Sequence, residues 1–312
     1  MMNGTRMARF GNRLLALLLA GALLTGCGGE RDPDEPTDTR TSGTIHISAD
    51  ESFRPVIDSE IRVFEALHPG THIIPHYKPE AECFRDFGVD SIRCVIATRA
   101  YSPQEKAFIN DSLKTEVSYN VAAYDAIAVI VHPSSKDTLF TLPEIRDLLT
   151  GKSQRGLRPV MDGLKATSTV RFLMDSVLRG APLGANVTAA DNSAGVIDYV
   201  SRNPDAVGFL GVSWVGNPQD STQLSYLSRI KVALLQDAKD TARFVWPAQY
   251  NIWYKRYPLR RDLVVVLKER HNGLGHGFAN YLTTTSGQMV FNRAFLMPAM
   301  MNFQVRSAEV KE

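Results

Sequence analysis

A run of hydroxyl residues, Thr167, Ser168 and Thr169, is the stretch of the chain whose side chains could do chemistry. It follows an Asp-Gly turn at residues 162–163 and precedes residues 170–177, whose apolar positions recur at helical spacing. The pattern predicts that the three hydroxyls open a helix. At a helix start the first backbone N–H groups lack internal partners and the helix dipole adds partial positive charge. An anion with several oxygen atoms could therefore bind there.

Two cationic side chains, Lys165 and Arg171, flank the hydroxyl run and could add charge to an anion site. The alternative is that the run only caps its helix, which is what most Ser and Thr residues at helix starts do. The choice between capping and anion binding depends on the rest of the chain.

The sequence contains no complete motif for catalysis. Residues 150–153, TGKS, resemble the end of a phosphate-binding loop, but Arg146 stands where that loop requires glycine. Residues 211–216 are one residue out of step with a nucleophile elbow. The acidic residues are scattered, and no pair stands out as an acid and base couple. We therefore predict that the protein is not an enzyme, and the hypothesis of a phosphate-handling enzyme lacks a named nucleophile or base.

The histidines are not grouped as metal ligands. His72 and His76 are four residues apart, but Pro75 argues against a helix that would put them on one face. His271 and His276 are expected in surface loops. Without a cluster of Cys and His at ligand spacing, we predict no metal site and no cofactor.

The elements around the hydroxyl run alternate between strand and helix, which is typical of an α/β fold with a mostly parallel sheet. A helix predicted near residues 57–67 ends before a Pro-Gly pair, and Thr141 and Glu144 form a capping box for another that ends at Gly151. Two strand-like runs share residues 117–132. Further strands are expected at residues 44–47, 72–77, 92–98, 158–161, 206–211, 230–235 and 262–267, and further helices at residues 80–87, 193–200, 273–282 and 288–295.

The charge of the chain gives no argument for a nucleic-acid partner. The formal net charge is +2, but three arginines in the first 26 residues account for its sign, because their removal changes it to −1. With 44% hydrophobic and 22% charged residues, the composition is that of an ordinary soluble globular protein. A length of 312 residues allows two lobes with separate cores.

Residues 1–26 have the pattern of an export signal, because arginines precede the apolar run at residues 14–24 and small residues follow it. That run is too short to span a bilayer. Residues 24–27, LTGC, resemble a bacterial lipobox, in which the peptide is cut before the cysteine and the cysteine is acylated. We therefore predict lipidation at Cys27, with an ordinary signal peptide as the alternative. Residues 27–43 are polar and acidic and are predicted to form a flexible tether.

Cys83 and Cys94 are the two cysteines of the predicted folded part. No CxxC pair exists, so the sequence has neither a thiol redox motif nor a zinc motif. Export would place the two cysteines in an oxidising compartment where a disulfide could persist. A disulfide and two unpaired buried thiols both fit the sequence, because geometry decides between them.

Several short segments occur in the order and spacing of one protein family. They are residues 47–53 (ISADESF), 124–133 (YDAIAVIVHP), 142–152 (ending LLTGK), 167–169 (TST), 203–209 (NPDAVGF), 257–261 (YPLRR) and 286–288 (SGQ). Over residues 44–300 this order resembles the PstS family, the phosphate-binding proteins of bacterial ABC uptake systems.

The resemblance implies an α/β fold of the type 2 periplasmic-binding class, with two mixed sheets flanked by helices and two hinge crossovers, near residues 125 and 240. Lobe 1 would comprise residues 44–125 and 241–312, and lobe 2 residues 126–240. In the family the ligand lies between the lobes, and hinge closure buries it.

The resemblance also implies which residues bind the ligand. The family holds its anion with backbone N–H groups, hydroxyls and arginine. Ser52 from lobe 1 and Thr167, Ser168 and Thr169 from lobe 2 match those positions. The family's arginine just before the anion loop is absent here.

The chain departs from the family pattern at Thr98 and Arg99, where the family has Ser-Asp. That aspartate accepts a hydrogen bond from protonated phosphate, which Arg99 cannot do, although Arg99 could add a bidentate cation. The family's serine-rich loop is replaced by residues 80–82, EAE. Glu80 or Glu82 could replace the missing acceptor or pair with Arg99 in a structural salt bridge. Arg171 or Arg99 could stand in for the missing arginine.

The sequence therefore predicts a lipid-anchored protein of the cell envelope, periplasmic or extracytoplasmic, that binds phosphate or a related oxyanion and delivers it to an ABC permease. The resemblance implies a monomer without chemistry of its own. The alternative is a ligand-sensing or surface interaction protein with a degenerate pocket, as the changes at Arg99 and Glu80 suggest. The sequence does not specify which oxyanion is bound, which membrane holds the protein or which permease receives the ligand.

Overall fold

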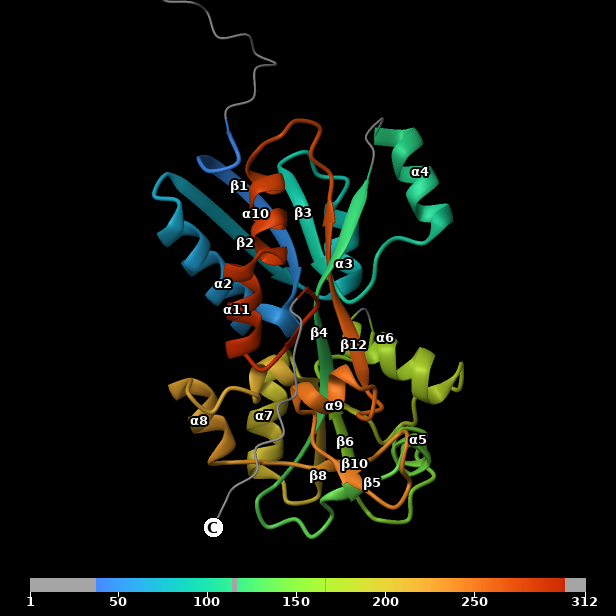
Figure 1. The fold of residues 1–312 in the computed structure, drawn as a ribbon. Coiled ribbons are helices and arrows are strands. Elements are labelled where there is room, and N and C mark those ends of the chain that lie inside the picture. The colour runs from blue at the N-terminus through green and yellow to red at the C-terminus, as the bar shows by residue number, and fades with distance from the viewer. Residues whose placement is uncertain (1–37, 114–116, 166, 301–312) are drawn as a thin grey trace, which may run out of the picture. The chain divides into compact units, whose positions relative to one another are not determined.

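The computed structural model describes residues 38–113, 117–165 and 167–300, all of which belong to one compact unit, Asp38–Glu312 (Figure 1). The predicted signal peptide, the predicted lipidation site Cys27 and most of the predicted tether lie outside the described residues. The unit begins within the segment predicted as a tether, because Asp38 is buried and Thr39 bridges to Ser42 just before the first strand. Among the described residues, no helix has the length and apolar character needed to cross a membrane.

Strands and helices alternate over most of the described chain. The strands are β1 (Gly43–Asp50), β2 (Thr71–Lys78), β3 (Ile92–Ala97), β4 (Ser118–Val131), β5 (Leu139–Phe140), β6 (Arg158–Met161), β7 (Thr188–Ala189), β8 (Ala206–Gly211), β9 (Lys231–Val232), β10 (Leu234–Gln236), β11 (Phe244–Val245), β12 (Arg260–Leu267) and β13 (Met297–Pro298). The α-helices are α2 (Arg54–Leu67), α3 (Glu80–Asp86), α4 (Pro103–Leu113), α5 (Leu142–Leu149), α6 (Ser168–Phe172), α7 (Ser193–Arg202), α8 (Ser221–Leu227), α9 (Gln249–Trp253), α10 (Leu274–Thr283) and α11 (Thr285–Arg293). Two 3-10 helices, η1 (Glu51–Phe53) and η3 (Val212–Trp214), and a π-helix, η2 (Leu173–Leu178), complete the set.

A ten-stranded mixed sheet runs in the order β2-β1-β3-β12-β4-β8-β6-β7, with β9 and β13 paired to β4 off this path. The pairings β1–β2, β1–β3, β6–β8 and β6–β7 are parallel, whereas β12 and β4 run antiparallel to their neighbours. Strands β11, β10 and β5 form a separate three-stranded sheet. The predicted α/β class with mixed sheets and flanking helices is confirmed.

The 14-residue strand β4 joins the two parts of the large sheet. Its first part pairs with β12 and its last part with β8 and β9. The two apolar runs expected in residues 117–132 are thus one strand, and the two predicted sheets are continuous through it. Along the last part, Ile127, Val129 and Val131 pack on one face and Ala128 and Ile130 on the other, which is the period of two that a strand imposes.

Both faces of the sheet around β12 are covered. Leu263, Val265 and Leu267 pack in a cluster with residues of α2, α10 and α11, which lie together on one side in Figure 1. Val264 and Val266 point to the opposite face and pack against residues of α3. A strand buried on both faces reads as a continuous apolar run, which is why the sequence predicts this strand.

After residue 240 the chain joins the large sheet again at β12, next to β4. Residues 234–245 contribute to the three-stranded sheet with β5 instead. Ile252, Tyr257 and Leu259 then pack in the cluster that contains Ile127 of β4.

Helix starts predicted from caps are confirmed. Oγ1 of Thr141 accepts from the backbone N–H of Glu144 at 3.3 Å, and Oε2 of Glu144 accepts from the N–H of Thr141 at 2.8 Å, which completes the capping box of α5. Thr167 caps α6 through the N–H of Val170.

Both cysteines of the described chain are free and buried. Cys94 lies in the core of α2, β1 and β12, and Cys83 lies on α3 in the cluster on the opposite face. Burial raises the pKa of Cys83 to about 12 and that of Cys94 further, so both are neutral thiols. Of the two alternatives that the sequence leaves open, the structure has the unpaired thiols.

Candidate functional site

Two serine hydroxyls from distant parts of the chain meet at one arginine. Nη1 of Arg261 donates to Oγ of Ser168 at 2.9 Å, and Nη2 donates to Oγ of Ser52 at 3.0 Å. The two hydroxyl oxygens are 3.4 Å apart, and all three residues are buried. The structure thus brings together two of the predicted ligand-binding residues, around an arginine that the sequence analysis did not assign to the site.

Both serines stand at helix starts. Ser52 lies in η1 directly before α2, and its backbone N–H donates to Oδ1 of Asp50 at 2.8 Å. Ser168 is the first residue of α6, which continues into the π-helix η2. At such positions unpaired N–H groups and the helix dipole favour negative charge. The local structure therefore has the features expected of an oxyanion site.

The two threonines of the hydroxyl run face a carboxyl group. Oγ1 of Thr167 donates to Oδ1 of Asp162 at 3.0 Å, and Oγ1 of Thr169 donates to Oδ2 at 3.1 Å. Burial raises the pKa of Asp162, and these hydrogen bonds oppose the rise. An anion bound here would compete with Asp162 for the same hydroxyl protons.

Arg261 is held in place by a buried ion pair. Its Nε lies 2.6 Å from Oδ2 of Asp125, and the two side chains are 1% and 0% exposed. Burial raises the pKa of Asp125, against the opposing effect of the guanidinium. Burial also disfavours the charge on Arg261, but the carboxyl groups of Asp125 and Asp50 outweigh it and raise its pKa. Arg261 is therefore a fixed cation at the centre of the site.

Asp50 is a buried acid of the candidate site with an unused oxygen. Its Oδ1 accepts from Ser52, whereas its Oδ2 has no hydrogen-bond partner among the described residues. Burial, with the nearby charge of Glu80, raises the pKa of Asp50 from 3.8 to about 7, and Arg261 opposes the rise. Asp50 can therefore carry or lose its proton close to neutral pH.

A cavity of about 220 Å³ adjoins these groups. It is lined by Asp50, Glu51, Arg54, Tyr77, Lys78, Pro79, Asp162, Thr167, Asp191 and Asn192. Four of these residues are acids and two are cations. Burial raises the pKa of three of the acids, Asp50, Glu51 and Asp162. An anion in this cavity would be favoured by protonation of its acids, because ionised carboxylates would repel it.

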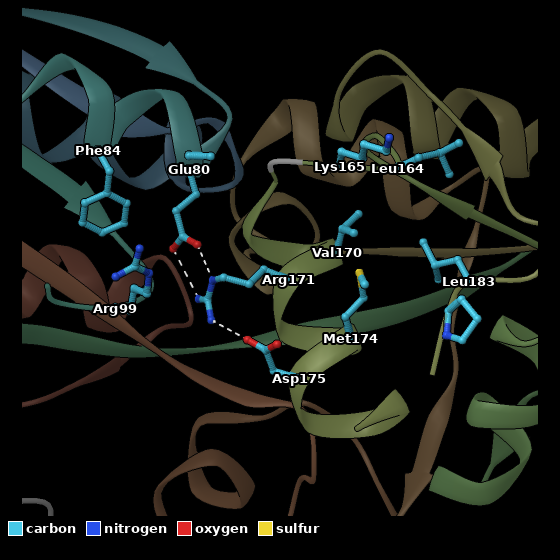
Figure 2. A pocket seen from close by; sticks show the side chains of 12 residues that line it. Glu80, Phe84, Arg99, Leu164, Lys165, Val170, Arg171, Met174, Asp175 and Leu183 are labelled. Atoms are coloured by element: carbon cyan, nitrogen blue, oxygen red, sulfur yellow. Dashed lines mark hydrogen bonds and ion pairs between the residues drawn. The ribbon is translucent and has the colours of Figure 1, made fainter. Parts of the chain in front are cut away.

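Glu80 and Arg171 join α3 to α6 across the site, as Figure 2 shows. Nε of Arg171 lies 2.6 Å from Oε2 of Glu80, and Nη2 donates to Oγ1 of Thr98 at 2.6 Å. Oε1 of Glu80 accepts from the backbone N–H and the hydroxyl of Thr98. Burial acts to raise the pKa of Glu80, but Arg171 and Thr98 outweigh it and lower the pKa. Glu80 is therefore an ionised structural acid and not a free acceptor for a ligand.

Arg99 is paired with Glu105, not with Glu80 or Glu82 as the sequence analysis considered. Nη1 of Arg99 lies 2.8 Å from Oε2 of Glu105, and its guanidinium carbon lies 4.2 Å from the centre of the Phe84 ring. The hydrogen bond from Arg99 lowers the pKa of Glu105 to about 2. The sequence could not indicate this partner, because it lies on α4, whose orientation only the fold decides.

Four residues of the candidate site were not assigned to it from the sequence: Arg261, Asp125, Asp50 and Asp162. Asp50, Asp125 and Arg261 lie within the segments ISADESF, YDAIAVIVHP and YPLRR that match the PstS pattern. Of these segments only Ser52 was assigned to the site, although their charged residues also match the family pattern.

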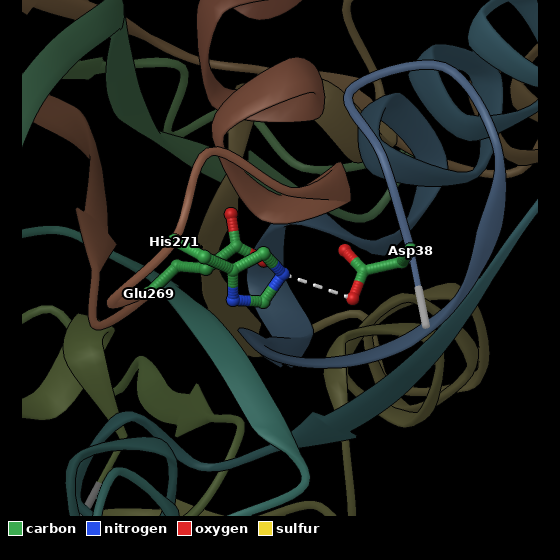
Figure 3. A group of neighbouring side chains, drawn as sticks. All are labelled: Asp38, Glu269 and His271. Carbon is green, nitrogen blue, oxygen red and sulfur yellow. Dashed lines mark hydrogen bonds and ion pairs between the residues drawn. The ribbon is translucent and has the colours of Figure 1, made fainter. Parts of the chain in front are cut away.

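Asp38, Glu269 and His271 are the group of described residues that could hold a metal ion, since their ligand atoms lie within 4.8 Å of one another (Figure 3). Asp38 already accepts from the N–H of Leu274 at 2.6 Å, and Glu269 accepts from the N–H groups of residues 275 and 276. The two carboxylates thus accept hydrogen bonds from backbone N–H groups in the first turn of α10. His271, expected in a free surface loop, bonds to Asp38 at 3.1 Å. The arrangement fits a structural clasp between the start of the unit and α10.

Comparison with known proteins identifies the architecture. Residues 34–286 match a family described as the PBP superfamily domain. A phosphate ABC transporter substrate-binding protein from Clostridium perfringens, solved with bound phosphate, has 21% identity and a TM-score of 0.69, with 82% of this chain and 100% of that chain covered. An ABC-type phosphate transport receptor from Vibrio cholerae has 15% identity and a TM-score of 0.60, covering 81% and 99%.

A third solved structure, PstS from Borrelia burgdorferi, has 14% identity and a TM-score of 0.52, covering 82% and 99%. At these identities the matches establish a shared fold and leave the ligand to be argued from the site. A search of curated proteins found no match.

Proposed function

The chain belongs to the PBP superfamily, and on that premise we propose that it is an extracytoplasmic solute-binding protein that captures phosphate or a similar oxyanion and delivers it to an ABC permease. The solved structures with the same fold include phosphate-binding proteins of such transporters. Binding proteins of transporters perform no chemistry themselves, and we propose the same for this chain.

The convergence of Ser52 and Ser168 on Arg261 is the observation that supports this proposal. Two helix starts and a fixed guanidinium meet at one buried point, although the two serines are 116 residues apart in the chain. Helix N–H groups, hydroxyls and a guanidinium are the donors that oxyanions prefer. Arg261 takes the role of cation that the sequence analysis gave to Arg99 or Arg171.

We propose that Asp50 distinguishes an anion that carries a proton from one that does not. Above pH 7 its carboxylate can only accept a hydrogen bond, so it favours an anion that still carries a proton and repels one that does not. Below pH 7 the neutral acid can donate and no longer repels. Phosphate carries a proton at neutral pH and sulfate does not, so Asp50 would make the selectivity depend on pH.

The binding event we propose joins two lobes. Lobe 1 would carry Ser52 and lobe 2 the hydroxyl run, with crossovers near residues 125 and 240. We also propose, on the basis of the sequence pattern, that the protein is exported, is acylated at Cys27, is monomeric and lies at the cell envelope.

Calorimetry with phosphate and sulfate at pH 6 and pH 8 tests the proposal. We expect micromolar phosphate binding at both pH values and sulfate binding at pH 6 only. Ser168→Ala should weaken phosphate binding at least tenfold, whereas Ser176→Ala, at an exposed serine of the adjoining π-helix η2, should leave it unchanged. Absence of binding by either anion at millimolar concentration would refute oxyanion capture.

A second candidate function is a sensor or interaction protein with a degenerate pocket. The observation in its favour is that Arg261 and the four hydroxyls of Ser52, Thr167, Ser168 and Thr169 already have partners within the chain. Such a protein would show no heat with either anion and no change in melting temperature. Permease and ATPase genes beside the gene for this protein would speak against it.

A further inference from the structure

We propose that a cavity between α3 and the α6–η2 segment is a second ligand site, and that it takes a small organic monoanion with an apolar body (Figure 2). Its volume is about 520 Å³, compared with about 220 Å³ for the cavity at Asp50. Ligand sites for small organic molecules span roughly 300 to 1,000 Å³. The cavity thus has the size for an organic molecule, far more room than an inorganic oxyanion needs.

The walls of this cavity are largely apolar. Val170, Met174 and Leu183 line it from the side of α6 and η2, with Leu164 from the preceding loop, and Phe84 lines it from α3. Figure 2 shows Val170, Met174 and Leu183 grouped on one side of the Glu80–Arg171 pair. A ligand whose body covers these side chains would remove apolar surface from water, which contributes about 25 cal/mol per Å² buried.

The charges at the cavity point to a single negative group on the ligand. Arg99 forms an ion pair with Glu105, and Arg171 forms ion pairs with Glu80 and Asp175. The exposed Lys165 also lines the cavity, and its side chain has no hydrogen bond or ion pair within the part of the chain that the structure describes. The unpartnered ammonium group of Lys165 could bind a carboxylate of the ligand, and the apolar wall beside it could bind the apolar body.

This site is separate from the proposed oxyanion site. Ser52, Ser168 and Arg261 do not line the cavity, and its lining shares no residue with that of the cavity at Asp50. Because its walls come from both α3 and α6, a bound molecule would touch the two elements that Glu80 and Arg171 hold together. Occupancy would therefore reinforce that contact, independently of whether an oxyanion binds.

Calorimetry on the purified full chain with 4-phenylbutyrate, and with the neutral 4-phenylbutanol as its uncharged counterpart, tests the proposal. We expect 4-phenylbutyrate to bind with a dissociation constant below about 1 mM. Lys165→Gln should weaken its binding about three- to tenfold and leave 4-phenylbutanol unaffected, because one exposed ion pair contributes about 1 kcal/mol. Leu183→Ser should weaken both ligands. Lys152→Gln, at another exposed lysine, should change neither.

Three outcomes would overturn the proposal. The first is no binding of 4-phenylbutyrate at 5 mM to protein whose circular dichroism is native. The second is equal binding by Lys165→Gln. The third is competitive displacement of 4-phenylbutyrate by phosphate, which would put the carboxylate in the oxyanion site. Failure of phosphate binding alone would leave this second site intact, so the two proposals are tested separately.

Discussion

Arg261 on β12 is the direct cross-strand neighbour of Asp125 on β4, and the two side chains form a fully buried ion pair of 2.6 Å between Nε and Oδ2. The pair lies on the two strands that connect the halves of the large sheet. It fixes the guanidinium so that its other nitrogen atoms reach Ser52 and Ser168. The same contact therefore serves the fold and prepares the candidate site.

Replacing Arg261 should cost both stability and binding. Arg261→Met leaves Asp125 as an uncompensated buried carboxyl group, and we expect the free energy of unfolding to fall by about 3–5 kcal/mol in urea titrations. Arg261→Lys keeps the charge but loses the planar fork, so it should fold better and still bind phosphate at least tenfold more weakly. A loss below 1 kcal/mol for Arg261→Met would mean that the pair is not a structural element.

Asp50 should make stability depend on pH. Its pKa in the folded state is raised to about 7 from 3.8, so its contribution to stability is complete below pH 4 and is lost as the pH rises through 7. Asp50→Asn can still cap Ser52 but cannot ionise. Relative to this variant, the wild-type protein should lose roughly 1.4 kcal/mol per pH unit between pH 4 and 7 in urea unfolding. Parallel pH profiles for the two proteins would contradict the assignment.

Glu80 and Arg171 should be strongly coupled. A double-mutant cycle with Glu80→Gln and Arg171→Gln, measured by urea unfolding, is expected to give a coupling energy of about 1–3 kcal/mol, because Glu80 is buried and both share Thr98. The exposed pair Arg229 and Asp198 is the matched control and should give less than 1 kcal/mol. Equal values for the two pairs would argue against a structural bridge between α3 and α6.

Arg99 should be dispensable for anion binding. Because its guanidinium is engaged by Glu105 and Phe84, Arg99→Gln is expected to change the phosphate dissociation constant less than twofold. In an NMR titration of the side-chain carboxyl groups, the same change should raise the pKa of Glu105 from about 2 towards 4.5. A tenfold loss of phosphate affinity in Arg99→Gln would contradict this prediction and show that Arg99 contributes to phosphate binding.

Gly273 should tolerate no side chain. A Cβ atom there would lie 2.3 Å from Oδ2 of Asp38 and 2.3 Å from Nε2 of His271, in the clasp at the start of α10. Gly273→Ala should lower the free energy of unfolding by about 1–3 kcal/mol. Gly195→Ala, inside α7 with only ordinary contacts around its new Cβ, is expected to be neutral or stabilising. Thermal unfolding of the two variants compares them directly.

Local patterns in the sequence were enough to determine much of the fold. The capping box at Thr141, the helix start at Thr167 and the apolar run of β12 depend on neighbours within a few residues, so their signals are complete in the sequence. The order of short motifs over residues 44–300 then indicated the family and its α/β architecture, which the structure confirms. The two serines at helix starts were found in the same way.

Only the tertiary structure decided the partners of the charged side chains. The sequence analysis considered Glu80 or Glu82 as partners of Arg99, whereas the fold joined Glu80 to Arg171 and Arg99 to Glu105. It also placed Arg261 beside Asp125 through the register of β4 and β12, which are 136 positions apart at this contact. The interaction energy of two charged side chains depends on their distance and burial. The residues next to a charged side chain in the sequence determine neither of these. The local sequence therefore determined the elements and their starts, whereas strand register and packing determined the electrostatics of the site.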